Sequence, residues 1–266
     1  MKSSLFKSND VDQFLAHLHR AIEPRGSRDV VLLFAGEAIR MIAFTMELLT
    51  TYLRREGRAR KSNGFSNTFF TGSRITSIAT STSQVAVSMG ALADMLAEWQ
   101  VMNRLWGALS MWIAAKDLFL RVSARRSSCE PVKVVDTTIQ ALQTICLTSF
   151  HICEATVLLS SRKIVKWSAK VEERLTFLAI RSWAAFTMIE IGRLSLDWTR
   201  MTQGKEKTVS DDWKARWKED MLQNLAWGSV ALHWSLRNGL LPEALVSPLA
   251  VFATWSLMKD AWKSSA

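Results

Sequence analysis

Residues that break helices or form turns are scarce in this sequence. Its 266 residues include four prolines and eleven glycines, and one tyrosine stands beside twelve tryptophans and twelve phenylalanines. Alternation of apolar and polar residues between turn signals, which is typical of strands, is also rare. The sequence therefore predicts an all-α fold.

Cysteines are few, and their placement argues against disulfides. There are three, an odd number. Cys146 and Cys153 lie on one predicted helix, about 10 Å apart along its axis, which is too far to bridge. The opening residues also lack the apolar core of a secretory signal. We therefore expect reduced thiols and a protein that faces the cytosol.

No uncharged apolar run has the length of a plain membrane span. The runs at 137–153, 221–236 and 244–258 all fall short of about 18 residues. Yet 48% of the residues are hydrophobic, and a mean hydropathy of +0.06 is high for a chain with 22% charged residues. Such runs are typical both of core helices and of helices lodged in a bilayer, so length leaves these two possibilities open.

The order of the runs predicts one helical domain over residues 1–266, a membrane-associated bundle of long amphipathic helices. Its expected parts are N-terminal helices with a basic cluster at 8–61, a long central helix at 74–122, apolar helices at 137–202, and a C-terminal helical hairpin at 213–263. The helix that begins near Asp29 has one narrow polar stripe, about 100° wide, and is otherwise apolar or small. The stripe consists of Asp29, Gly36, Glu37, Arg40, Glu47, Thr51 and Arg54.

The net charge of +10 favours anionic partners. Basic residues are dispersed over every connector, which argues against a nucleic-acid surface and favours anionic phospholipids. The densest basic cluster is Arg54, Arg55, Arg58, Arg60 and Lys61. It can contact an anionic membrane, at about 1 kcal/mol per basic residue, or be a solvated loop that obeys the positive-inside bias.

Tryptophans flank the apolar runs next to charged residues. Indole prefers the headgroup level of a bilayer, although the edges of ordinary amphipathic helices have the same pattern. The predicted interfacial aromatics are Trp167, Trp198, Trp213, Trp217 and Trp262.

Motifs of enzymes and metal sites are missing. We find no glycine-rich phosphate loop, nucleophile elbow or paired catalytic acids. His151, Cys153 and Glu154 are close in sequence, but their spacing does not suit zinc and no second ligand pair exists. We therefore predict no enzyme, no metal and no cofactor. Four residues that interrupt apolar helices are candidates for lining a pore, namely His151, Arg181, Glu190 and Arg193.

The closing segment ALHWSLRNGLLPEALVSPLAVFATWSLMKDAWK reads as two apolar helices joined by a turn. We expect the turn to comprise Arg237, Asn238, Gly239, Pro242 and Glu243. A lone carboxylate at membrane depth is costly, so Arg237 is the expected partner of Glu243.

Three segments together resemble the peroxin-eleven family of peroxisomal membrane proteins. They are VDQFLAHLHRAIEPRGSRDVVLLFAGEAIRMIAF, ADMLAEWQVMNRLWGALSMWIAAKD and the closing segment quoted above. The resemblance implies a peroxisomal, or in a divergent member glycosomal, membrane protein that self-associates. It also implies work with the peroxisomal fission machinery to elongate the membrane through an amphipathic helix. Residues 54–95 match that helix poorly, because RITSIATSTSQVAVSMGAL is rich in Ser and Thr and almost uncharged.

Three functions are therefore open at the level of sequence. The first is membrane remodelling during peroxisome proliferation, in which an apolar helix face enters one leaflet by about 5–10 Å and bends the bilayer. A Ser/Thr-rich face of this kind senses lipid-packing defects better than it senses charge. The alternatives are a channel or metabolite carrier of the same membrane, and a soluble helical scaffold.

Overall fold

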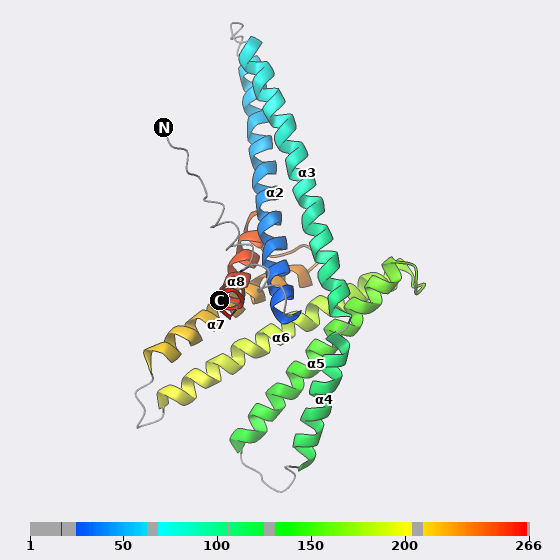
Figure 1. Cartoon of the computed structure of the whole chain (residues 1–266), viewed down its shortest axis with the longest axis vertical. Coiled ribbons are helices and arrows are strands. Elements are labelled where there is room, and N and C mark those ends of the chain that lie inside the picture. Colours follow the sequence, from blue (N-terminus) through cyan, green and yellow to red (C-terminus); the bar gives the residue numbers. More distant parts are fainter. Residues whose placement is uncertain are drawn as a thin grey trace. The chain divides into compact units, whose positions relative to one another are not determined.

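The computed structural model describes residues 17, 25–62, 69–105, 107–124, 131–203 and 210–264, and over these residues it is helical without strands (Figure 1). The predicted all-α fold is confirmed. The helices are α2 (Arg25–Ser62), α3 (Phe69–Arg104), α4 (Gly107–Ala124), α5 (Pro131–Ser161), α6 (Ala169–Gln203), α7 (Asp211–Ser235) and α8 (Glu243–Ser264).

The predicted central helix at 74–122 is not continuous. It is divided into α3 and α4 by a turn in which the Leu105 backbone N–H donates to the Met102 carbonyl at 3.2 Å. The glycine that begins α4, Gly107, lies against the His151 ring, and a Cβ there would be 3.0 Å from His151 Cε1. A side chain at this position would collide with the ring, so the glycine permits a close approach of α4 to α5.

The chain divides into two compact units, and a single domain over residues 1–266 stays a prediction. Unit 1 comprises Met1–Glu98 and Glu243–Ala266, and unit 2 comprises Trp99–Pro242. Each unit is described by itself below.

In unit 1, α8 packs on α2, and the side chains that α8 buries in this unit are small. Ala250, Ala253 and Thr254 are completely buried, and the rings of Phe34 and Trp255 are 5.7 Å apart. Side chains as small as alanine and threonine let two helix backbones approach closely. Pro248 lies inside α8 and supplies no backbone N–H to its helix.

Also in unit 1, the polar stripe of α2 faces α3. Arg40 donates to Asp94 at 3.3 Å, and Gly36 lies against Leu96. The two contacts run in opposite directions along the helices, which are therefore antiparallel. On α3 the buried positions recur every seven residues, at Ala79, Ala86 and Ala93.

In unit 2, α5 packs antiparallel on α6, α6 packs on α7, and α4 packs on α5. Aromatic rings fill the contact between α6 and α7, where Trp183 meets Trp227 at 5.0 Å in an edge-on arrangement. Gly228 permits the close approach, because a Cβ there would be 2.8 Å from Met188 Cε. Ser210 caps the start of α7 by accepting the Trp213 backbone N–H at 3.3 Å.

The turn after α7 is built around one histidine. His233 Nδ1 accepts the backbone N–H groups of Leu240 and Leu241, both at 2.9 Å, so this nitrogen carries no proton. Gly239 has φ +60°, and a Cβ there would be 2.3 Å from His233 Cε1, so only glycine fits. Four of the predicted turn residues, Arg237, Asn238, Gly239 and Pro242, lie between α7 and α8, whereas the fifth, Glu243, is the first residue of α8. Within their units α7 packs on α6 and α8 on α2, so the packing of α7 on α8 stays a prediction.

Side-chain size and polarity are distributed in the opposite way to a soluble core. Among the described residues, ten of the fifteen buried apolar residues are alanines, and buried polar residues include Glu37, Thr50 and Thr187. Thirty-five large apolar side chains are exposed, with Trp112 at 71% and Phe119 at 70%. In soluble proteins leucine, isoleucine and phenylalanine are among the residues most often buried.

Two helices are long and apolar enough to cross a membrane, by length and composition: 134–161 within α5 and 169–203 within α6. This corrects the expectation that no run is long enough. That expectation ended each run at its first charged residue, such as Glu154 or Arg181, whereas a span tolerates one or two. Only 6% and 17% of the most apolar stretches of these helices are buried, unlike the core helix of a soluble protein.

Candidate functional site: a polar seam between two apolar helices

Polar side chains meet at four levels along the antiparallel pair of α5 and α6. Gln143 donates to Glu190 at 2.6 Å, and the Ser182 hydroxyl donates to the Ser149 hydroxyl at 3.1 Å. The outer levels are the Arg200–Asp136 ion pair at 2.7 Å and the Ser160–Glu172 hydrogen bond. We call this set the polar seam. These contacts join residues far apart in the sequence and fix the antiparallel register of the two helices.

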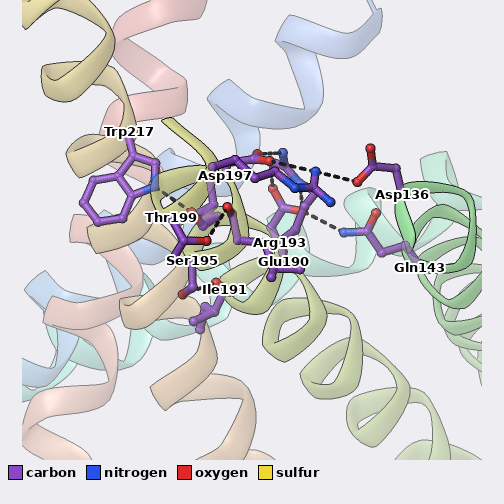
Figure 2. Close-up of polar contacts among 12 residues, drawn as sticks. Asp136, Gln143, Glu190, Ile191, Arg193, Ser195, Asp197, Thr199 and Trp217 are labelled. Atoms are coloured by element: carbon purple, nitrogen blue, oxygen red, sulfur yellow. Dashed lines mark hydrogen bonds and ion pairs between the residues drawn. The ribbon is translucent and has the colours of Figure 1, made fainter. Parts of the chain in front are cut away.

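One arginine joins the centre of the seam into a network (Figure 2). Arg193 binds both carboxylate oxygens of Glu190, with Nε at 2.8 Å from Oε2, and its Nη1 is 2.7 Å from Asp197 Oδ2. A bidentate arginine–carboxylate pair is among the strongest side-chain contacts. The Glu190 side chain is only 19% exposed, so this carboxylate depends on Arg193 and Gln143 for compensation of its charge.

Helix α7 contacts α6 close to the seam. The Trp217 indole N–H donates to the Leu194 carbonyl at 2.9 Å, and the Trp217 ring lies 4.4 Å from the Trp198 ring. Asp220 also lies on α7, and its carboxyl pKa is raised by burial and by the neighbouring Glu219. The carboxyl therefore takes up a proton more readily than an ordinary aspartate.

Three of the five predicted interfacial tryptophans come together here. Trp198 is 6.0 Å from Trp213 and 4.4 Å from Trp217, and these three rings form one stack at the contact of α6 and α7. Trp167 is 49% exposed in the α5–α6 connection. Trp262, in unit 1, stacks on His17 at 3.9 Å. Their position at a membrane interface stays a prediction.

Two of the four pore candidates pair with each other, and the other two lie elsewhere. Glu190 and Arg193 form the bidentate pair described above. Arg181 lies over the Phe177 ring at 5.5 Å, and its Nε is 3.4 Å from the Ser235 carbonyl oxygen. His151 lies at the α4–α5 contact beside Gly107.

Sequence reasoning missed the other residues of the polar seam and the side chains joined to it. Asp136 and Gln143 are seven residues apart on α5, and the charges of α6 alternate at Glu190, Arg193, Asp197 and Arg200, in steps of three and four. That spacing places them on one helix face and was the available signal. Also missed was an ion pair between Arg104 and Glu154 at 3.0 Å.

The side chain of Glu243 lies outside the described residues, so its pairing with Arg237 stays a prediction. Arg237 donates to Glu173 on α6 at 3.0 Å and lies 5.9 Å from the Phe177 ring, so its charge is already compensated within unit 2.

The basic cluster lies on a helix and not in a loop, because α2 continues to Ser62. Arg54, Arg55 and Arg58 are exposed there. The side chains of Arg60 and Lys61 lie outside the described residues. Elsewhere on α2, Glu37 is 8% exposed, and burial raises its pKa although Arg40, at 3.1 Å, acts in the opposite direction.

Within the described ranges, no group of three His, Cys, Asp or Glu side chains is placed to hold a metal ion. Comparisons with family models, with curated proteins and with solved structures found no match for the chain.

Proposed function

We propose that this chain is a membrane-embedded helical protein that bends and elongates the membrane that holds it. The observation that carries the proposal is the distribution of side chains: small and polar residues lie inside, while large apolar residues lie outside. Resemblance to the peroxin-eleven family adds the location, a peroxisomal or glycosomal membrane, together with self-association and cooperation with the fission machinery.

The energy of the exposed side chains supports a lipid environment. Burial of one large apolar side chain away from water is worth about 1.5–3 kcal/mol. With thirty-five such side chains exposed, transfer of their surface into lipid recovers tens of kcal/mol. That is several times the net stability of a typical domain, about 5–15 kcal/mol.

The polar seam fits the same environment. A charged side chain within lipid is costly unless it is paired, and helices in membranes associate through small residues and hydrogen bonds between helices. Glu190 is paired with Arg193 and Gln143, and Ser149 with Ser182. We assign the α5–α6 pair the role of membrane anchor.

The bending element that we propose is the outer face of α3. Ile78, Val85, Leu92 and Met95 are between 40% and 57% exposed, and they follow one another at steps of seven, seven and three residues, with Ser81 and Ser88 between them. Such a face, apolar and weakly charged, suits lipid-packing defects, and insertion by about 5–10 Å expands one leaflet. The channel alternative has less support, because Glu190 and Arg193 neutralise each other.

Flotation of the full chain with liposomes, followed by imaging of liposome shape, tests the proposal. The wild type should float and draw tubules, whereas the triple variant Ile78→Ser, Val85→Ser, Leu92→Ser should float through α5 and α6 without drawing them. The control variant Ser81→Ala, Ser88→Ala keeps the apolar face and should still tubulate. A wild-type chain that stays monodisperse without detergent and ignores liposomes overturns the proposal.

A further inference from the structure

A cavity lies between α2 and α3 within unit 1. Its volume is about 360 Å³. Its walls are the polar stripe of α2 and the small-residue face of α3. The lining residues are Arg40, Ala43, Phe44, Glu47, Thr50, Thr51 and Arg54 on α2, and Ser83, Ala86, Val87 and Gly90 on α3.

The cavity exists because the side chains that α3 turns to α2 at this level are small. Ser83, Ala86 and Gly90 follow one another at steps of three and four residues, so they share the face that is turned to α2. A Cβ added at Gly90 would meet no atom within 4 Å. The cavity can therefore be filled by a larger side chain at Gly90 without a collision at its first carbon.

Two opposite charges in the cavity have no ion pair among the described residues. Arg40 is occupied, since it binds Glu37 at 3.1 Å and Asp94 at 3.3 Å. The negative Glu47 carboxylate and the positive Arg54 guanidinium belong to residues two helical turns apart on the same face of α2. An anion would satisfy Arg54 and leave Glu47, and a cation would do the reverse. A zwitterion satisfies both.

We propose that this cavity binds the headgroup of a phospholipid that carries a primary amine, such as phosphatidylethanolamine. The phosphate accepts hydrogen bonds from Arg54, and the ammonium donates to Glu47. A quaternary ammonium has no N–H to donate and is bound by aromatic cages, whereas Phe44 is the only aromatic residue that lines this cavity.

The surroundings of the cavity suit the rest of such a lipid. Ala43, Phe44 and Val87 line its apolar part. Leu48 and Val85, on the neighbouring faces of the two helices, are 53% and 43% exposed. Acyl chains can lie along these faces while the headgroup binds the exposed side chains of Glu47 and Arg54. The inference rests on the proposed membrane association, and it adds a preferred lipid.

Native mass spectrometry of the full chain in detergent tests the inference, with phosphatidylethanolamine, phosphatidylcholine and phosphatidylglycerol as probes. We expect phosphatidylethanolamine to bind at least about tenfold more tightly than phosphatidylcholine and phosphatidylglycerol. This is the effect of one charge-assisted hydrogen bond. Glu47→Gln should abolish the preference for ethanolamine over glycerol. Gly90→Leu, which fills the cavity, should reduce binding of the ethanolamine lipid by a similar factor.

Gly192→Leu is the matched control, because Gly192 is also a helical glycine at which a Cβ would meet no atom within 4 Å, and it lies in unit 2. This variant should bind like the wild type. Unchanged binding by Gly90→Leu, or equal binding of all three lipids by the wild type, overturns the inference. Soluble glycerophosphoethanolamine and inorganic phosphate are the remaining probes, and binding of either as tight as that of the lipid overturns a lipid ligand.

Flotation separates this inference from the proposed function. If Gly90→Leu still floats and tubulates liposomes but loses its lipid preference, both stand. If the wild type tubulates liposomes without any headgroup preference, only the cavity assignment fails. If the wild type ignores liposomes of every composition, the proposed function fails.

Discussion

Replacement of Arg193 by methionine removes the cation at the centre of the polar seam and keeps most of the side chain's length. Glu190 then retains only the Gln143 amide as a partner, and its side chain is 19% exposed. Loss of one partner of a fully buried ion pair costs about 3–5 kcal/mol. Arg193 is 37% exposed, so solvent screens part of this loss, and we expect the free energy of unfolding to fall by about 2 kcal/mol.

A double-mutant cycle separates the contact from the side effects of the substitution. Glu190→Gln alone leaves Arg193 paired with Asp197 at 2.7 Å and should cost less than Arg193→Met. Since the double variant buries no uncompensated charge at Glu190, its cost should be smaller than the sum of the two single costs, by about 1–2 kcal/mol.

Denaturant unfolding in detergent micelles, followed by tryptophan fluorescence, measures the four free energies. Trp198 and Trp217 lie close to the seam and report on its opening. Arg174→Met, an exposed position on the same helix, is the control and should change stability by less than about 0.5 kcal/mol. Additive effects at 190 and 193, within about 0.5 kcal/mol, would show that the two side chains do not interact and would refute the stabilising role of the Arg193–Glu190 pair.

Three further predictions concern other parts of the chain. Gly239→Ala should lower the free energy of unfolding by about 2–3 kcal/mol, because φ is +60° and the new Cβ would displace the His233 ring from its two hydrogen bonds; an unchanged melting temperature would contradict this. Ala253→Leu should destabilise the α2–α8 contact by about 1–3 kcal/mol, since the alanine is fully buried, and protease nicking of α8 would measure it. The raised pKa of Glu37 means that the folded state binds more protons, so stability should fall as pH rises above the ordinary value of 4.5; Glu37→Gln should remove this dependence on pH in denaturant unfolding, which a parallel pH profile of both proteins would check.

Helical content was predictable from sequence because breakers are rare, and the apolar helices expected at 137–202 match α5 and α6 closely. The break between α3 and α4 was not, since the residues before Gly107 carry no turn signal. The polar stripe of α2 could be read from spacing alone. That this stripe faces α3 could not be predicted, because the contact depends on the small residues of α3. Small side chains give little hydropathy signal.

The same limit applies to the seam. Arg193 and Glu190 stand out as charges in an apolar helix, and a pore is a reasonable expectation for such residues. Gln143, which donates to Glu190, and Asp136, which pairs with Arg200, come from another helix, and the antiparallel register that brings them to α6 is a property of packing. The charges of individual residues in an apolar helix therefore located the site. Which side chains pair between α5 and α6 required the structure.

The contact between α2 and α8 imposes an order on biosynthesis. Helix α2 ends at residue 62 and its partner α8 begins at residue 243, so the 180 residues 63–242 must be translated in between. At about 5–20 residues per second this takes roughly 10–40 s. Throughout that interval α2 lacks its α8 partner, and we expect a ribosome-bound chaperone or an insertase to cover this face of α2 until α8 emerges.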